Sequence, residues 1–245
     1  MSELVSIKVE SGVLEIVFDR RAQKNALSLE MYTAAAEALR KAGEDQEIRA
    51  VLLSGAGGHF TSGNDLIDFM KNPPSGEESP VFQFLLALRE CPVPVGAAVE
   101  GYAIGIGTTM LLHCDFAWSA PTAKFRMPFV NLGLVPEAAA SVILPAMAGH
   151  RLAAELLYFG EFFDAETAAA AGIINEIVDG DLYEFARERV GKLAALPPEA
   201  LKLTKGLLRK ADDEKVMAAM REEAAIFVRR LQSPEFMAAV AAFQK

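Results

Sequence analysis

The 245-residue sequence contains only two cysteines and three histidines, and each scarcity excludes a class of protein. Cys91 and Cys114 are too few for a disulfide scaffold and lack the spacing of a zinc site, so both are predicted to be small buried side chains in a reducing compartment. The histidines are scattered, with no second ligand at metal-binding spacing. We therefore predict no metal site.

Basic charge is also scarce. The chain has 24 Lys and Arg against 33 Asp and Glu, which gives a formal net charge of -9 and a pI near 5.0. Nucleic-acid binding needs a concentrated basic face, so a nucleic-acid partner is not expected. The apolar runs are well short of the roughly 20 residues of a membrane-spanning helix, and residues 1–4 lack the features of a secretory signal. These absences predict a cytoplasmic protein with no membrane partner.

Hydrophobic residues make up 52% of the chain, enough for the core of one large domain or of a domain with a helical appendage. A β-hairpin is predicted around Ser11-Gly12, and a helix is predicted after Ser28, whose hydroxyl can cap the first turn. The same alternation continues with strands at 49–54, 95–99 and 115–119 and with helices at 81–89 and from Gly107. This pattern predicts an α/β fold with a mostly parallel sheet and right-handed crossovers.

The chain after residue 138 is dominated by alanine-rich amphipathic segments. Apart from a strand-like stretch at 173–178, helices are predicted at 182–196, 198–209, 216–231 and 234–243. Two interpretations of these helices stay open at this stage. They pack on the core, or they have a second apolar face that docks on a neighbouring subunit.

Two glycine-rich turns carry the main chemical signal. His59–Asp65 and Gly101–Gly107 lie about one crossover unit apart, and each follows a strand-like run and opens into a helix-like one. Such turns can direct two backbone N–H groups at one oxygen, where they would stabilise a developing negative charge. A carboxylate, Glu137, follows in the loop 132–137, where it could act as acid or base on the same ligand. The simpler interpretation is that the glycines only make tight turns.

Five segments resemble the crotonase superfamily, also called the enoyl-CoA hydratase/isomerase family, in order and spacing. They are residues 20–28, 60–66, 99–107, 114–115 and 132–136, and the tail segment 196–202 also matches. The resemblance implies an α/β spiral of ββα units over residues 1–195, with the coenzyme A site and an oxyanion hole. It implies a helical trimerisation region over residues 196–245, and assembly as a trimer or a dimer of trimers. It also implies an acyl-CoA thioester as substrate and no cofactor, because coenzyme A is part of that substrate.

The resemblance also assigns roles to single residues. The oxyanion hole falls on the backbone N–H groups of Asn64 and Ile106. Asp65, directly after the first turn, is interpreted mainly as a helix cap. Three basic residues, Arg20, Arg21 and Lys24, suit the nucleotide phosphates, although they can equally be solvated charges. The residues that would bind substrate are Lys24, Ala26, Leu27, Ser62, Gly63, Asp65, Leu66, Gly105, Phe129 and Pro136.

Departures from the family pattern favour one reaction. The two positions where hydratases of the family carry glutamate are occupied by Thr109 and Phe129, neither of which can exchange a proton near neutral pH. Glu137 stands where other members bear a working Asp or Glu, and the local strings look most like the Δ3,Δ2-enoyl-CoA isomerase branch. We expect Glu137 to remove a proton from C2 of a 3-enoyl thioester and return it at C4, with its pKa raised by an apolar pocket.

Other functions stay open at this stage. A hydratase-like enzyme or a specialised acyl-CoA hydrolase would use Glu137 differently, and a non-catalytic acyl-CoA-binding protein would not turn over substrate. The segment 72–80 is predicted to form a lid or pocket wall, and the final residues 243–245 resemble a shortened family tail that reaches a neighbouring subunit's coenzyme. Acyl length, pathway and the choice between trimer and hexamer do not follow from the sequence. Candidate acyl-chain walls, which can equally be core, are Ile67, Phe69, Met70, Phe82, Leu85 and Leu86.

Overall fold

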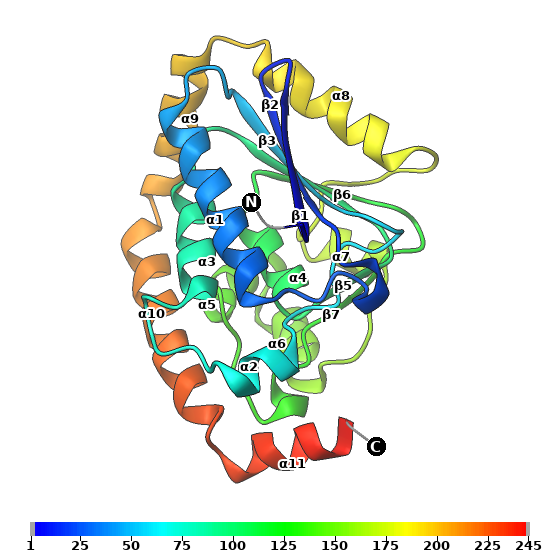
Figure 1. Ribbon diagram of the computed structural model, residues 1–245, viewed down its shortest axis with the longest axis vertical. Coiled ribbons are helices and arrows are strands. Elements are labelled where there is room, and N and C mark those ends of the chain that lie inside the picture. Colours follow the sequence, from blue (N-terminus) through cyan, green and yellow to red (C-terminus); the bar gives the residue numbers. More distant parts are fainter. Residues whose placement is uncertain (1–2, 244–245) are drawn as a thin grey trace.

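A computed structural model describes residues 3–243 of the chain (Figure 1). Its main sheet has the strand order β1-β2-β3-β4-β6-β8. β1 is antiparallel to β2, and every other neighbouring pair in this sheet is parallel, which confirms the predicted hairpin and the mostly parallel sheet. The strand bounds are Val5–Glu10 (β1), Val13–Phe18 (β2), Ala50–Gly55 (β3), Val95–Val99 (β4), Phe116–Ser119 (β6) and Glu176–Ile177 (β8).

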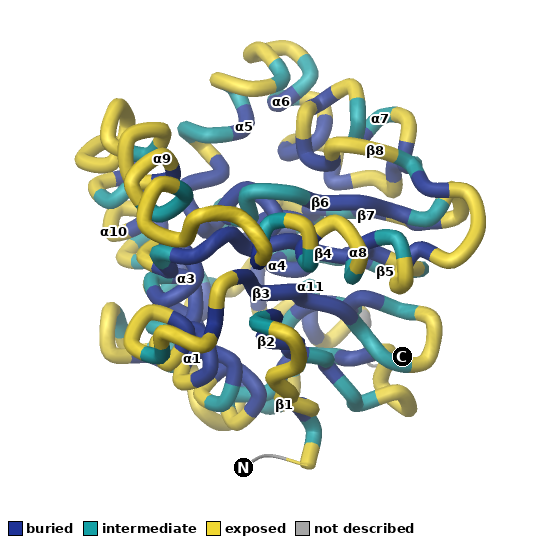
Figure 2. The backbone as a smooth tube through the Cα atoms, turned by 90° about the horizontal axis from the view of Figure 1, so that it is seen from above, coloured by how far each residue is buried: buried dark blue, intermediate teal, exposed yellow. Residues whose placement is uncertain are grey.

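Helices cover both faces of this sheet, as the buried central strands in Figure 2 show. Side chains alternate along a strand, so Val51 and Leu53 point to the face covered by α1 (Leu29–Glu44) and α3 (Pro80–Glu90). Leu52 and its counterparts on other strands point to the opposite face, beneath α8 (Leu182–Ala194). A Cβ at Gly96 would lie 2.8 Å from the Trp118 ring and 2.9 Å from Val190, so a glycine lets α8 approach.

A second, smaller layer supports the candidate site. Its two strands, β5 (Tyr102–Ile104) and β7 (Lys124–Arg126), are parallel. Three isolated bridges extend it, Leu27 to Asn64, Thr61 to Ala103, and Phe125 to Phe163. The chain leaves β3, β4 and β6 in turn, adds one segment to this layer and then enters helical structure. This repeated path is the spiral of ββα units that the resemblance implies.

Two elements are shorter than the patterns predict. The helix expected from Gly107 is a four-residue α4 (Ile106–Thr109), followed by the 3₁₀ turn η2 (Met110–His113). The Thr108 hydroxyl donates to the Ala103 carbonyl oxygen at 2.5 Å, a local bond that competes with regular helix continuation. The strand expected at 173–178 is reduced to β8, two residues at the sheet edge.

The C-terminal helices pack against the body of the protein. α9 (Pro198–Lys210) and α10 (Asp213–Arg230) run along one side, and α11 (Pro234–Phe243) crosses the end (Figure 1). Lys205 is 6% exposed and contacts the Asp115 carboxylate at 2.6 Å, and Arg209 contacts the same carboxylate at 3.2 Å. These ion pairs tie α9 to the start of β6, so the core-packing interpretation holds for this face. The boundary at residues 195 and 196 stays a prediction.

The remaining helical elements connect the layers. They are η1 (Arg21–Gln23), α2 (Leu66–Lys71), η3 (Val130–Leu132), α5 (Ala140–Ala148), α6 (His150–Phe159) and α7 (Ala165–Ala170). No helix in residues 3–243 is both long and apolar enough to cross a membrane. Cys91 is buried as predicted, whereas Cys114 is only half-buried because it lies at the end of η2. Predictions placed on residues 1, 2, 244 and 245 lie outside the described residues.

Candidate active site

Glu137 is a buried carboxyl group in the loop before α5. Its side chain is 7% exposed, and its Oε1 has no hydrogen-bond partner among the described residues. Burial in apolar surroundings, together with the negative charge of Glu223, raises the pKa of Glu137 to about 8. The carboxyl group therefore changes its protonation state close to neutral pH, as a general base or acid must.

The backbone after Glu137 is unusual. Ala138 and Ala139 both adopt left-handed conformations, with φ of 63° and 54°, which non-glycine residues rarely do. The Nε2 atom of His113 lies 2.8 Å from the Ala138 carbonyl oxygen. Burial lowers the pKa of His113 to about 4, so the ring is neutral at pH 7 and Nε2 can donate this bond as one tautomer. The strained turn is thus held by the core behind it.

Glu223 on α10 is a second buried carboxyl group, and it was not among the site residues predicted from the sequence. It is 6% exposed, and its Oε1 accepts hydrogen bonds from the Ser141 N–H at 2.9 Å and the Ser141 hydroxyl at 2.5 Å. One sequence signal could have revealed it. Val216, Met220, Glu223 and Phe227 recur at helical spacing, which places an acidic residue on the apolar face of α10.

The two glycine-rich turns lie against each other. Gly63 and Gly105 have φ of 93° and 58°, and a Cβ at Gly63 would lie 2.7 Å from the Ile104 carbonyl oxygen and 4.0 Å from the Gly105 nitrogen. Asn64 follows the first glycine, and Ile106 is the first residue of α4. Within residues 3–243, neither of these N–H groups has a backbone or side-chain acceptor. The arrangement leaves two adjacent turns with a free donor each.

Tyr32 on α1 contacts the first glycine-rich turn. Its hydroxyl donates to the side-chain oxygen of Asn64. Tyr32 is fully buried, and burial together with the charge of Glu137 raises its pKa well above the usual range, so the phenol stays protonated. This contact is not evident from the sequence, because Tyr32 occupies an ordinary apolar position of an amphipathic helix.

Two cavities meet at this site. The larger is a groove of about 960 Å³, a size typical of small-molecule sites. The smaller, of about 40 Å³, is lined by Glu137 and Ala138, and Phe69 and Phe227 line both cavities. Predicted site residues along the groove are Lys24, Ala26, Ser62, Gly63, Asn64, Asp65, Leu66, Gly105 and Phe129.

Three predicted site residues do not line either cavity. Leu27 is fully buried, and its backbone pairs with the first turn, donating to the Gly63 carbonyl oxygen at 2.8 Å and accepting from the Asp65 N–H at 2.9 Å. Ile106 is also fully buried, so its backbone alone could serve a ligand. Pro136 is half-buried and directs the chain into Glu137.

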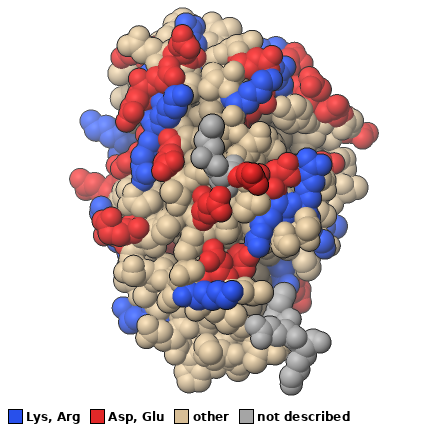
Figure 3. Space-filling model, viewed as in Figure 1, with Lys and Arg blue, Asp and Glu red and all other residues tan. Residues whose placement is uncertain are grey.

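The three basic residues predicted near the coenzyme phosphates each contact a different partner. Arg20 contacts the Asp65 carboxylate at 2.5 Å, and Arg21 contacts Asp19 at 2.8 Å. Lys24 lies over the Tyr102 ring, 4.8 Å from its centroid, and lines the groove. Asp65 caps α2 as predicted, accepting from the N–H groups of residues 67 and 68. Figure 3 shows acidic and basic side chains interspersed over the visible face.

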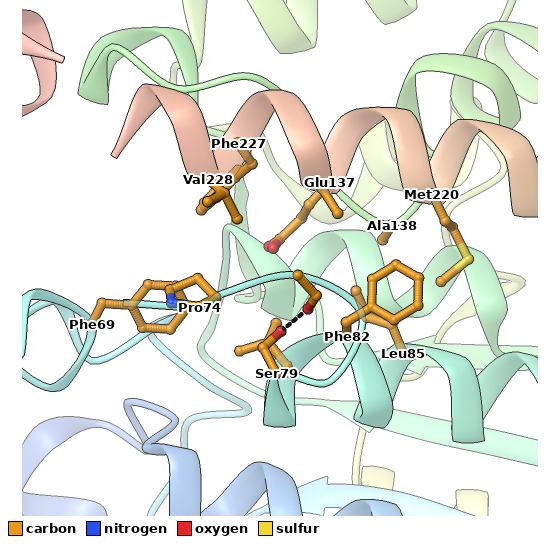
Figure 4. Close-up of a pocket in the computed structure, with 13 residues that line it drawn as sticks. Phe69, Pro74, Ser79, Phe82, Leu85, Glu137, Ala138, Met220, Phe227 and Val228 are labelled. Atoms are coloured by element: carbon orange, nitrogen blue, oxygen red, sulfur yellow. Dashed lines mark hydrogen bonds between the residues drawn. The ribbon is translucent and has the colours of Figure 1, made fainter. Parts of the chain in front are cut away.

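The smaller cavity has apolar walls, as Figure 4 shows. The Glu137 carboxyl group points into the space between Phe227 of α10 and the segment around Ser79. Pro74, Gly76 and Ser79 belong to the predicted wall segment at 72–80, and all three line the cavity. Of the candidate acyl-chain walls, Phe69, Phe82 and Leu85 line this cavity, whereas Ile67 lines the groove.

The two positions expected to lack a hydratase carboxylate lie close to the second turn and the groove. Thr109 is fully buried, and its hydroxyl donates to the Gly105 carbonyl oxygen at 3.4 Å. Phe129 is 3% exposed and is one of the residues that line the groove. Among residues 3–243, no group of three or more His, Cys, Asp or Glu side chains is placed to hold a metal ion.

The ββα spiral defines a fold of the crotonase type, and its buried carboxyl group lies in an apolar cavity beside a groove. Comparison with known proteins agrees. The chain belongs to the enoyl-CoA hydratase/isomerase family, whose profile matches residues 8–245.

Individual relatives narrow the comparison. The chain is 35% identical over 249 residues to human enoyl-CoA delta isomerase 2, covering 98% of this chain and 63% of that protein, so it spans about three fifths of the relative's length. It is 34% identical over 220 residues to 1,2-epoxyphenylacetyl-CoA isomerase of Escherichia coli K12, covering 86% and 84% of the two chains. The solved structure of Pseudomonas aeruginosa OdaA has a TM-score of 0.95 and 47% identity, covering 99% of each chain.

Proposed function

We propose that this protein is a Δ3,Δ2-enoyl-CoA isomerase that moves a double bond by a 1,3-proton shift. The observation that carries the proposal is Glu137, a carboxyl group buried in the apolar cavity beside the groove with its pKa raised to about 8. A base with a pKa near the working pH can both accept and return a proton. Relatives named delta isomerases support this choice within the family.

The proposed reaction uses one carboxyl group and two backbone donors. The thioester occupies the groove along Asn64 and Gly105, and its acyl group enters the cavity. Ionised Glu137 removes the C2 proton of the 3-enoyl group, and the electrons move to the thioester oxygen. The N–H groups of Asn64 and Ile106 stabilise this dienolate. Protonated Glu137 then returns the proton at C4 and is regenerated, so atoms and charge balance without a redox cofactor.

Hydration needs more than this site offers. Adding water across a double bond requires deprotonation of the water and delivery of a proton to carbon, which two positioned carboxylates perform in the family's hydratases. Thr109 and Phe129 stand at those positions, and Phe129, which lines the groove, offers an apolar side chain where a hydratase has a carboxylate. We therefore propose isomerisation in preference to hydration or thioester hydrolysis.

Replacing Glu137 with glutamine tests the proposal, because the amide keeps the shape and removes the base. We expect Glu137→Gln to lower kcat for a 3-enoyl-CoA at least about 100-fold, as loss of general-base catalysis does. Glu161→Gln, at an exposed position, serves as the matched control. A 2-enoyl-CoA substrate is assayed in parallel for the 3-hydroxy product. Persistent isomerisation in Glu137→Gln, or faster hydration than isomerisation by the unmodified protein, would reject the proposal.

We also propose a homotrimer or dimer of trimers as the working form. Supporting it, α9 presents Leu203, Leu207 and Leu208 to the surface at 61%, 72% and 76% exposure, and α6 presents Tyr158 and Phe159 at 65% and 64%. Large apolar side chains gathered on helix faces are typical of subunit contacts. Sedimentation analysis of the protein and of Leu207→Glu tests this, since a monomer in both cases would exclude the assembly. The cytoplasmic location and the absence of a nucleic-acid partner stay predictions.

A further inference from the structure

The second buried carboxyl group, Glu223, has no role in the reaction proposed above. Four neighbours on α10 line the apolar cavity, Met220, Ala224, Phe227 and Val228, but Glu223 does not. Its Oε1 instead bonds Ser141 in the first turn of α5, directly after the strained Ala138-Ala139 pair. Glu223 therefore acts on the turn behind Glu137 and not on a ligand in the cavity.

Two buried carboxyl groups close together are costly, and each keeps an oxygen without a partner. Glu137 Oε1 and Glu223 Oε2 are both buried and lack a hydrogen-bond partner among the described residues. A charged carboxylate on Glu223 is favoured by its two Ser141 donors, whereas Glu137 has no donor to its Oε1. Burial also raises the pKa of Glu223, but its Ser141 donors oppose that rise, so Glu223 ionises before Glu137 and its charge opposes the ionisation of Glu137.

The groups that face Glu137 come from several elements. Tyr32 on α1 is a neutral phenol, and Ser79 in the wall segment donates its hydroxyl hydrogen to the Gly76 carbonyl oxygen. The residues of α2 and α3 that line the cavity are apolar. In the described part of the chain, Glu223 is the charged group that shifts the pKa of Glu137, and it raises it.

From this arrangement we infer that Glu223 is a positioning residue for Glu137. Its carboxylate holds the start of α5, and its charge makes Glu137 a stronger base without touching the substrate. The inference rests on the proposed function, because it assigns Glu137 the role of base. A carboxylate of higher proton affinity removes a weakly acidic C2 proton faster once it is ionised. The same carboxylate is ionised only at higher pH, so the range of pH in which it can act as a base is narrower.

Glu223→Gln separates charge from shape, because the amide oxygen can still accept from Ser141. We expect the pKa of Glu137 to fall by about one unit when the neighbouring charge is removed. The low-pH limb of kcat/KM then moves down by the same amount, while the plateau rate at high pH falls several-fold because the base is weaker. KM changes little, since Glu223 does not line the cavity. A low-pH limb that moves down together with a lower plateau rate indicates an effect of the Glu223 charge. A purely structural role would lower the rate without moving the limb.

The measurement that does not need turnover is a carboxyl carbon-13 NMR titration of Glu137, whose resonance is identified by its absence in Glu137→Gln. Glu222→Gln is the matched control, since Glu222 is the neighbouring residue on α10 and is exposed. An unchanged Glu137 titration in Glu223→Gln, or an equal change in Glu222→Gln, overturns the inference. Failure of Glu223→Gln to fold also overturns it, because the amide is required to replace the carboxylate as an acceptor.

The experiments distinguish a failure of the proposed function from a failure of this inference. If Glu137→Gln still isomerises substrate, Glu137 is not the base, whatever the NMR titration shows. If Glu137→Gln is inactive but the Glu137 titration ignores Glu223, the isomerase proposal stands and the positioning role falls. The Glu223→Asp variant adds a check, because it keeps the charge and should keep the pKa of Glu137 well above that in Glu223→Gln.

Discussion

The imidazole Nε2 of His113 lies 2.8 Å from the carbonyl oxygen of Ala138, so the turn after the second glycine-rich segment holds the turn that carries Glu137. The His113 carbonyl oxygen in turn accepts from the Arg209 guanidinium at 2.8 Å. Groups far apart in the chain are therefore joined behind one carboxyl group. We therefore expect substitutions at these groups to change the position of Glu137.

His113→Leu is expected to leave the buried Ala138 carbonyl oxygen without its donor. An unpaired buried carbonyl costs about 1–3 kcal/mol, and the free energy of unfolding measured in urea should fall by that amount. The strained turn also loses its restraint, so kcat should fall more than KM changes. His113→Gln, which retains an N–H donor, should recover part of both losses. Equal kcat in His113→Leu and the unmodified protein would show that the contact does not position Glu137.

Gly63 and Gly58 form a natural pair for testing the juxtaposed turns. Both have left-handed φ, 93° and 78°, so an alanine at either position incurs a similar backbone strain of about 1–2 kcal/mol. A Cβ at Gly63 would lie 2.7 Å from the Ile104 carbonyl oxygen, whereas a Cβ at Gly58 meets nothing within 4 Å. Gly63→Ala should therefore push the two turns apart and lower kcat about 100-fold or more, as loss of an oxyanion donor does. Gly58→Ala should retain kcat, and matching losses in the two variants would contradict this account.

The raised pKa of Glu137 predicts that Glu137→Gln gains stability although it loses activity. Unfolded glutamate ionises near pH 4.5, but in the folded protein the carboxyl group stays protonated until about pH 8. Unfolding therefore releases a proton between these values, and stability falls as the pH rises through that window. Glu137→Gln removes this loss, so it should be more stable than the unmodified protein by up to about 3 kcal/mol at pH 7. Thermal unfolding from pH 4 to 8 measures it, and a difference that does not grow with pH would disagree.

Much of the fold could be predicted because local patterns encode it. The alternation around Ser11-Gly12 predicts the β1–β2 hairpin, and the hydroxyl of Ser28 caps α1 through a 3.4 Å contact with the Met31 N–H. Most of the substrate-binding residues that the family resemblance predicts line one groove in the structure. Such features depend on periodicity, caps and turn residues, all of which act over a few positions.

What could not be predicted depends on contacts between distant segments. Glu223 meets Ser141 across 82 positions, and Tyr32 meets Asn64 across 32, so no local pattern reports either pair. The left-handed Ala138 and Ala139 are equally hidden, since alanine favours the right-handed helix when nothing else constrains it. The buried Glu223, whose charge adds to the effect of burial on the pKa of the candidate base, is therefore a tertiary feature.

The wall of the small cavity predicts how acyl specificity can be changed. Phe82 on α3 is 4% exposed and lines the cavity opposite Glu137, where the available volume is about 40 Å³. Phe82→Leu removes ring atoms from this wall, so kcat/KM should shift toward longer acyl chains, by about 10-fold for each methylene that the new space accepts. Phe84→Leu, also on α3 but turned away from the cavity into the core, is the matched control for loss of packing. Competition between short and long 3-enoyl-CoA substrates gives the ratio directly. An unchanged ratio in Phe82→Leu, or the same shift in Phe84→Leu, would mean that the acyl chain does not reach this wall.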